Sequence, residues 1–492
     1  MSHSPAFKAS VAVVLLALLC LPFADLRIGT VDPWAELGRM AWGLLTPRFM
    51  AAPELLDALA KTVAFALLGV GLGAAAGFAL ALAFHRRAVR WGAAGLRSIH
   101  EIFWALLFMQ ALGLGAVTGV LAIALPYAGV FAKVFAEFLE EADPAPLRAL
   151  PAGAGRLAGF FYGRLPGVWR LMRSYGSYRL ECGLRSSAVL GFIGLPTLGF
   201  HLETFFRQGR YSHAAALLLL FYLLIATLRG WARPRLLLLY GAAALAFLWS
   251  PVDVSWDNAA RFLLHDLLPY PLRAGPAPGA LEALGAWLLR LLREQALPGL
   301  VATWLLAQIA LAVTGGLTLL LFPLASRRFV GWGGQKLGHG LLVVLRSTPE
   351  FVLAYLFLQL WGPSMLPAIL ALALHNAGII ATLTGRHADS LPLRPDAPRG
   401  VNLYGYEILP RVYGQFLAFL FYRWEIILRE TAILGILGVR TLGFYVDSAF
   451  AELRFDRALV LILATAALNI AVDSGSRALR ARLRLSTRAG AA

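Results

Sequence analysis

The sequence is poor in charged residues. Only 14% of its 492 residues are Asp, Glu, Lys or Arg, against about 25% in a typical soluble domain, whereas 59% are hydrophobic. So few charges do not suffice to cover a water-exposed surface, and several apolar runs approach the roughly 20 residues that cross a bilayer. The composition therefore predicts an integral membrane protein and excludes a soluble globular enzyme.

Cysteine is nearly absent, and the common catalytic motifs are absent altogether. The two cysteines, Cys20 and Cys182, both stand in apolar stretches, so no disulfide framework is expected. The chain contains no HExxH, no Cys/His pairs at metal-ligand spacing, no GxSxG and no GxxxxGK[ST] loop. We therefore predict no catalytic or ATP-hydrolysing centre, no metal site and no cofactor in this chain.

Acidic residues are missing around the basic ones. The net charge of +17 would suit nucleic acid, but most of the excess sits in four acid-free clusters that each flank an apolar run. This is the pattern of cytoplasmic loops in membrane proteins, so we expect no nucleic-acid partner and cytoplasmic N- and C-termini. The clusters are Arg86, Arg87, Arg90 and Arg97; Arg229, Arg233 and Arg235; Arg327, Arg328, Lys336 and Arg346; and Arg477, Arg480, Arg482, Arg484 and Arg488.

The apolar runs predict about twelve transmembrane helices. Ala9 to Phe23 lacks a convincing signal-peptide cleavage site and is interpreted as a retained first helix. The segments Asp25 to Pro53 and Asp253 to Gln295 would lie outside and contain amphipathic surface helices. The expected spans are 9–24, 55–84, 98–115, 117–137, 168–190, 211–229, 236–252, 298–325, 341–361, 364–384, 412–435 and 456–473.

The chain is a tandem duplication. Residues 179–200 (RLECGLRSSAVLGFIGLPTLGF) recur as 423–444 (RWEIILRETAILGILGVRTLGF), with 12 of 22 positions identical, and 97–129 match 346–378 at 14 of 33. Six spans in each half give both halves the same orientation. We therefore predict two parallel six-helix repeats, 1–235 and 236–492.

Charged residues recur within the fifth helix of each half. Glu-x-x-x-Arg spacing places both charges on one helical face, where they can neutralise one another. Arginine offers a planar fork of donors that suits phosphorus oxyanions, so these residues are candidates for a substrate pathway. A purely structural ion pair, or snorkelling at the membrane edge, is the alternative. The residues are Glu181, Arg185, Glu425 and Arg429, with Arg179 and Arg423 earlier in the same helices.

A glycine-rich turn follows each of these helices. Glycine permits positive φ and close backbone approach, which a gate beside a pore requires. Ordinary small-residue helix packing is the alternative, but recurrence in register favours the gate. The glycines are Gly191, Gly194 and Gly199 in the first half and Gly435, Gly438 and Gly443 in the second.

The longest internal cytoplasmic segments are 138–166 and 385–410. Each ends in a Leu-Pro pair, Leu165-Pro166 or Leu409-Pro410. Such a loop can dock a partner protein, or it can be a solvated connector, and its length does not decide between these readings.

Together these segments resemble the membrane permease of phosphonate ABC importers. The resemblance rests on RSIHEIFWALLF, on YRLECGLRSSAVLGFIG and on their second-half counterparts, and it covers most of both halves. It implies an ABC type I importer-like pore in the bacterial inner membrane, two ATP-binding-cassette subunits that hold ATP and Mg, and a periplasmic substrate-binding protein. Fusion of two copies would supply the whole pore from one chain.

The sequence departs from that family in the loop expected to couple to the ATPase. The acidic first position of its motif is lost in both halves, although Gly153 and Ala154 remain in the first. In the second half, Pro392, Pro395 and Pro398 would hinder a regular helix. Two alternatives therefore stay open: an ion-gradient-driven secondary transporter, and a degenerate membrane component that does not transport.

Overall fold

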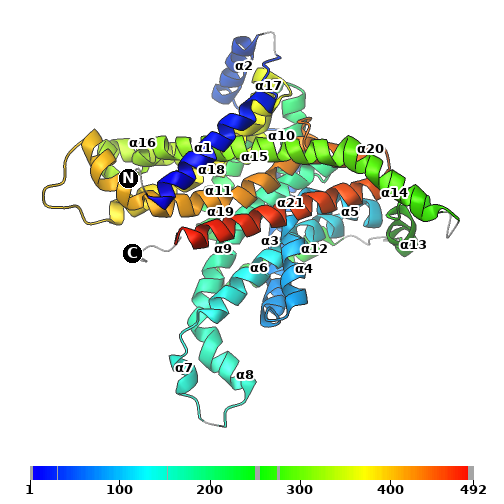
Figure 1. Cartoon of the computed structure of the whole chain (residues 1–492), viewed down its shortest axis with the longest axis horizontal. Helices are drawn as coiled ribbons and strands as arrows, with labels where there is room; N and C mark the ends of the chain where they lie inside the picture. Colours follow the sequence, from blue (N-terminus) through cyan, green and yellow to red (C-terminus); the bar gives the residue numbers. More distant parts are fainter. Residues whose placement is uncertain (1–3, 30–31, 152, 250–254, 274–277, 486–492) are drawn as a thin grey trace. The chain divides into compact units, whose positions relative to one another are not determined.

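The computed structural model describes residues 4–29, 32–151, 153–249, 255–273 and 278–485, and these residues form helices and connecting turns with no strand (Figure 1). The chain forms two compact units. We call Met40–Leu268 the first-repeat unit, and Met1–Arg39 together with Pro269–Ala492 the second-repeat unit.

The first-repeat unit contains most helices of the predicted first half. They are α3 (Ala52–Leu82), α4 (Arg87–Ser98), α5 (Glu101–Leu112), α6 (Ala116–Glu140), α7 (Ala145–Arg148), α8 (Arg156–Ala158), the π-helix η2 (Gly159–Arg164), α9 (Leu165–Val189), α10 (Leu198–Arg207) and α11 (Tyr211–Trp231), followed by α12 (Leu237–Leu248) and α13 (Trp256–Arg261). The last residues of the predicted helix 236–252 lie outside the described residues, as does Arg488.

The second-repeat unit has a matching series. It consists of α1 (Pro5–Cys20), α14 (Ala280–Leu291), α15 (Leu297–Leu321), α16 (Arg327–Ser347), α17 (Glu350–Trp361), α18 (Met365–Ser390), the π-helix η8 (Leu403–Ile408), α19 (Leu409–Ile436), α20 (Leu442–Ala451) and α21 (Phe455–Arg482). The amphipathic helix α2 (Pro33–Leu45) contains the boundary between the units. Helices α2, α13 and α14 lie in the two segments where surface helices were expected.

Seven helices in the described part of the chain are long and apolar enough to cross a membrane, and two bent helix pairs raise this number to nine. The predicted number of twelve spans stays a prediction, because helices such as α5 and α12 have only 12 residues each. At 1.5 Å per residue such a helix covers about 18 Å, less than the roughly 30 Å of hydrocarbon.

One predicted helix is wrong. The expected span 341–361 is broken between α16 and α17, whose axes differ by 92°. Pro349 explains the break, because a proline forces the preceding residue out of the helical region. Thr348 accordingly has φ −65° and ψ 120°. In the first repeat the chain breaks at the equivalent place, where Ile99 is extended with φ −91° and ψ 130°.

Glycines allow the helices of the first-repeat unit to approach closely. Gly69, Gly73 and Gly77 form one stripe on α3, and α6 crosses directly over it. A Cβ atom on Gly73 would lie 2.8 Å from Cβ of Tyr127, and one on Gly77 would lie 2.4 Å from Cβ of Phe131. Small residues at every fourth position are a common means of packing helices in lipid, where burial of apolar surface drives association little.

The first helix of each predicted repeat packs in the unit that the other repeat builds. Helix α1 contacts α15, and α12 contacts α3. A hydrogen bond of 2.6 Å from the Tyr413 hydroxyl to Ser10 Oγ adds a contact between α19 and α1. The predicted boundary at residue 235 therefore divides the repeats of the sequence but does not coincide with the boundaries of the compact units.

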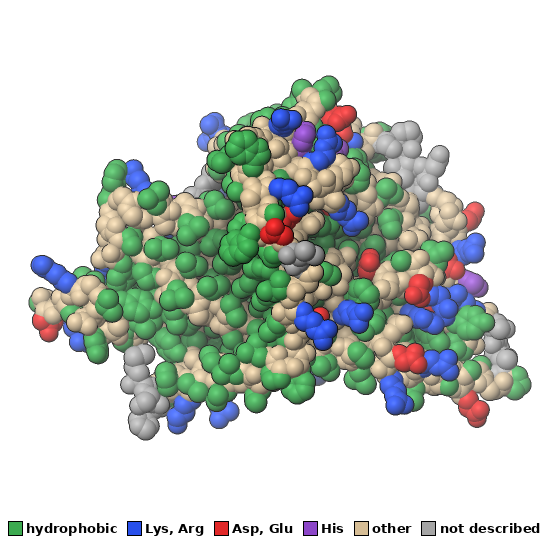
Figure 2. Space-filling model, turned by 90° about the horizontal axis from the view of Figure 1, so that it is seen from above, with side chains coloured by type: hydrophobic (Ala, Val, Ile, Leu, Met, Phe, Trp, Pro, Cys, Tyr) green, Lys and Arg blue, Asp and Glu red, His purple; other side chains and the backbone are tan. Residues whose placement is uncertain are grey.

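Apolar side chains remain exposed in large number, as expected for helices that face lipid. Leu19 is 69% exposed, Leu238 89% and Leu320 74%. Figure 2 shows hydrophobic side chains over much of the visible face. Together with the apolar helices, this surface identifies a multi-pass membrane protein.

Candidate functional site

The glycine turn of the first repeat has the geometry that only glycine permits. Gly194 ends the helical segment after α9 with φ +94°, in the left-handed region. The backbones on either side of it touch. A Cβ on Gly191 would lie 2.2 Å from the nitrogen of Phe200, and one on Gly199 would lie 1.8 Å from the carbonyl oxygen of Ala188.

The second repeat builds the same turn. Gly438 has φ +95°. A Cβ on Gly435 would lie 2.3 Å from the nitrogen of Phe444, and one on Gly443 would lie 2.2 Å from the oxygen of Ala432. The predicted positive φ and close backbone approach are thus present in both halves. The gating role itself stays a prediction.

A buried threonine fixes each turn to the second helix of its repeat. Thr62 Oγ1 on α3 accepts a hydrogen bond of 2.9 Å from the backbone N–H of Leu198, the first residue of α10. Thr303 Oγ1 on α15 accepts one of 2.9 Å from Leu442, the first residue of α20. These threonines satisfy N–H groups that helix starts leave without an intrahelical partner.

The predicted arginines of the first repeat each contact a residue of their own helix. Nη2 of Arg185 lies 3.4 Å from Sγ of Cys182, and Nε of Arg179 donates to the Tyr175 hydroxyl at 2.7 Å. Glu181, predicted to neutralise Arg185, makes no ion pair within the described residues. The helical spacing is right, but spacing alone does not fix the rotamers of two long side chains.

In the second repeat, Arg423 is buried within α19. Its Nε donates at 2.6 Å to Oδ1 of Asn376 on α18. Arg429 and Glu425 are half-buried on the same helix, in the positions that correspond to Arg185 and Glu181.

A polar network that the sequence analysis did not single out joins three helices of the first-repeat unit. Ser186 on α9 donates to Oε1 of Glu101 on α5 at 2.8 Å, and the Tyr127 hydroxyl on α6 lies 3.2 Å from Ser186 Oγ. His100 Nδ1 lies 3.8 Å from Glu101 Oε2. Ser186 thus links the Glu101 carboxylate to the Tyr127 hydroxyl.

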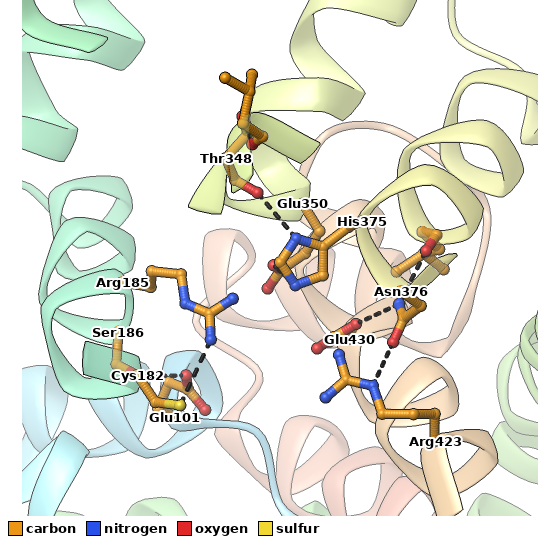
Figure 3. A network of polar contacts seen from close by, with 12 residues as sticks. Glu101, Cys182, Arg185, Ser186, Thr348, Glu350, His375, Asn376, Arg423 and Glu430 are labelled. Atoms are coloured by element: carbon orange, nitrogen blue, oxygen red, sulfur yellow. Dashed lines mark hydrogen bonds and ion pairs between the residues drawn. The ribbon is translucent and has the colours of Figure 1, made fainter. Parts of the chain in front are cut away.

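The equivalent network of the second-repeat unit contains more ionisable side chains (Figure 3). Glu350 replaces Glu101, Asn376 replaces Tyr127, and a second carboxylate, Glu430, replaces Ser186. His375 points towards the Thr348 carbonyl oxygen, with Nδ1 at 2.9 Å, and its Nε2 lies 3.8 Å from Glu350 Oε2.

The repeat shows which positions of the two networks correspond. The offset of 249 pairs Glu101 with Glu350, and the offset of 244 pairs Ser186 with Glu430. These offsets do not show that Glu350, His375 and Glu430 come together in space.

The two cytoplasmic loops differ in structure. The first contains the short helix α7, and Gly153 and Ala154 lie in the turn between α7 and α8. In the second, the described residues 391–400 contain no helix, in agreement with the expectation from Pro392, Pro395 and Pro398. Both Leu-Pro pairs begin a helix, Leu165-Pro166 starting α9 and Leu409-Pro410 starting α19. Proline suits this position because its fixed φ matches the first helical turn.

The second loop is fastened to its own unit. The buried carboxylate of Glu407 pairs with Arg411 at 2.7 Å and with Arg394 at 3.6 Å. Arg411 also donates to the Pro392 carbonyl at 2.7 Å, and Arg328 Nη2 donates to the Asp389 carbonyl at 2.9 Å. Both loops expose large apolar or aromatic side chains, since Leu157 is 74% and Tyr162 76% exposed in the first, and Val401 is 85% and Tyr406 79% exposed in the second.

The chain is an internally duplicated, helical membrane protein, and comparison with known proteins identifies it as a transport permease. The chain belongs to the family of permease proteins of phosphite and phosphonate transport systems. A putative phosphite transport permease of Stutzerimonas stutzeri is 32% identical over 206 residues, which are 73% of that protein and 39% of this chain. A putative cryptic phosphonate transport permease of Escherichia coli K12 is 33% identical over 109 residues, 89% of its length and 22% of this chain.

A phosphate-import permease of Mycolicibacterium smegmatis matches across both repeats. It is 27% identical over 470 residues, which are 86% of this chain and 84% of the relative. The phosphite permease is about half as long as this chain, since the same matched residues make up 73% of one and 39% of the other. This is the length expected for a single copy. No family model and no solved structure matches the chain.

Proposed function

We propose that this chain is the membrane-spanning permease of an ATP-driven importer for phosphonate or a related phosphorus oxyanion. One observation carries the proposal. The likeness to the phosphate-import permease extends over 86% of the chain, so it reaches into both repeats. A chain with two such repeats can supply a complete translocation path, which single-copy permeases need two chains to form.

The pathway is lined by the arginines of the fifth helices. Arg185 and Arg429, with Arg179 and Arg423 earlier in the same helices, present donors that suit phosphorus oxyanions. Burial of Arg423, whose Nε donates to Asn376 on α18, supports this role against snorkelling at the membrane edge. The glycine turns at Gly194 and Gly438 form the gate.

ATP hydrolysis takes place on two separate ATP-binding-cassette subunits, which also hold the Mg²⁺ and lie on the cytoplasmic side with both termini of the chain. A periplasmic binding protein delivers the anion to this inner-membrane pore. Loop 138–166 is the stronger ATPase contact, because it contains the short helix α7 followed by Gly153 and Ala154. Loop 385–410 is tied to its own unit through Glu407.

Uptake by cells tests the function and its energy source. Cells that produce the chain with the matching ATPase and binding protein should accumulate radiolabelled phosphate, phosphite or methylphosphonate. Accumulation should stop when the phosphate-binding lysine of the ATPase is replaced, and it should survive an uncoupler while cellular ATP is maintained. Uptake that needs the ion gradient but not the ATPase would establish a secondary transporter instead. Absence of uptake for all three anions would favour a component that does not transport.

A further inference from the structure

Glu430 is a buried carboxylate without a cationic partner in the part of the chain that the structure describes. It is 8% exposed, and its only hydrogen bond comes from the neutral amide Nδ2 of Asn376, at 3.3 Å. An ionised carboxylate in an apolar interior is strongly unfavourable unless a positive charge compensates it. Arg423 bonds the other end of the Asn376 amide but makes no ion pair with Glu430, so a cation or a proton at the carboxylate itself would compensate its charge.

Two further ligand groups converge on the same point. One atom each of Glu350, His375 and Glu430 lies within 4.8 Å of the others. The 3.8 Å between His375 Nε2 and Glu350 Oε2 exceeds the roughly 2.7–2.9 Å of a charge-assisted hydrogen bond. It is less than twice the 2.0–2.1 Å typical of a zinc–ligand bond, so both atoms can bind one ion placed between them.

The outer groups hold these ligands in the arrangement that metal sites use. His375 Nδ1 lies 2.9 Å from the Thr348 carbonyl oxygen, and donation to that carbonyl presents the Nε2 lone pair to the cluster. Asn376 bonds to Glu430, and Arg423 in turn donates to Asn376 Oδ1 at 2.6 Å. Figure 3 shows Asn376 between Glu430 and Arg423. Two of the three ligands thus have an orienting partner.

We propose that Glu350, His375 and Glu430 bind a divalent transition metal, with Zn²⁺ as the representative ion. Two carboxylates balance its charge, and a nitrogen ligand favours zinc over the magnesium and calcium ions that prefer oxygen alone. Three protein ligands leave a coordination position open, as in zinc sites that bind water or an anion. The metal site belongs to the second repeat only, because Pro126 and Ser186 stand at the positions of His375 and Glu430.

Metal content of the purified full chain tests this site. The protein in detergent is stripped with a chelator, incubated with Zn²⁺, desalted and analysed by mass spectrometry of the metal. The parental chain should retain one zinc per molecule. Glu430→Ser and His375→Gln should bind zinc at least ten-fold more weakly. The Glu430→Ser variant uses the residue that the first repeat tolerates at the same place, so its fold should persist. Glu101→Gln, which changes the first-repeat counterpart of Glu350, is the control and should retain one zinc.

A second measurement separates metal binding from loss of fold. A bound ligand stabilises the folded state by mass action, so Zn²⁺ should raise the unfolding temperature of the parental chain and of Glu101→Gln but not that of Glu430→Ser. Two results overturn the proposal: a parental chain that retains no zinc, in which case Glu430 carries a proton, or equal zinc retention by Glu430→Ser and the parental chain.

Discussion

Thr62 and Leu198 are 136 residues apart in the sequence and joined by a hydrogen bond of 2.9 Å. Thr303 and Leu442, 139 residues apart, repeat the contact at the same distance. Each bond ties the turn after the fifth helix of a repeat to the second helix. A turn that carries positive φ and touching backbones is thereby held at one place, which a gate beside a translocation path needs.

Replacement of Thr62 by valine should destabilise the protein. Valine has the same shape but cannot accept the Leu198 N–H, and an unsatisfied buried N–H costs about 1–3 kcal/mol. Thermal unfolding in detergent measures the effect, and Thr303→Val should behave alike. Thr227 is exposed and bonds only within its own helix, so Thr227→Val is the control and should unfold near the parental temperature. Equal unfolding of all three variants would contradict the structural role.

Gly199→Ala should prevent accumulation of folded protein. The new Cβ would meet a backbone carbonyl at 1.8 Å, and the two segments must separate to admit it. Overpacking of an ordinary core costs about 1–3 kcal/mol, and a clash between two backbones exceeds that range. Gly176 in α9 has open space where a Cβ would project, so Gly176→Ala should be neutral or stabilising by up to about 1 kcal/mol. Fluorescence-detected size-exclusion chromatography compares the two, and similar monodisperse peaks would refute the prediction.

Arg185→Leu and Arg429→Leu should abolish anion uptake, whereas the lysine variants should only reduce it. Lysine keeps the charge but loses the planar fork that matches an oxyanion. Uptake of labelled phosphonate, normalised to membrane protein level, distinguishes these outcomes. If both leucine variants carry the anion at the parental rate, the arginines are structural.

Glu181→Gln should leave the protein level unchanged, in contrast to the expectation from sequence. The carboxylate makes no ion pair among the described residues, so its loss leaves no arginine without a partner. Immunoblotting of membranes measures the amount. A marked fall in folded protein would show that Glu181 does compensate Arg185 in the membrane.

Cysteine cross-linking should detect stronger contact of the ATPase with the first loop than with the second. Tyr162 and Tyr406 occupy corresponding positions, 76% and 79% exposed, and so form a matched pair for substitution by cysteine after Cys20 and Cys182 are replaced by serine. A heterobifunctional reagent should couple Tyr162→Cys to the ATPase in higher yield. Equal yields, or coupling through the second position alone, would contradict the unequal roles of the loops.

The sequence predicted the glycine turns well because glycine has few other reasons to recur in register. Gly194 and Gly438 share positive φ, and Gly199 and Gly443 share the close approach, as that reasoning required. The break at Thr348 could also have been predicted, since Pro349 restricts the backbone conformation of the residue before it. The apolar residues on both sides instead suggested one continuous helix.

Packing partners between distant helices could not be predicted. The apolar faces of α1 and α12 carry no information about which core they will contact, because in lipid any apolar helix offers a comparable surface. The network of Glu350, His375 and Glu430 escaped for a related reason. Its members come from three helices, and nothing in their spacing along the chain brings them together.

Because α1 and α12 are exchanged between the repeats, each half of the chain needs a helix of the other half to complete its compact unit. When permeases assemble from two separate chains, the partners must meet by diffusion in the membrane and can also pair wrongly. Here the covalent join fixes the ratio at one to one and turns the second association into an intramolecular step with a high effective concentration. Duplication thereby freed the two copies to diverge. Corresponding positions such as Ser186 and Glu430 can therefore differ, and so can the two loops, without either difference being copied into both halves.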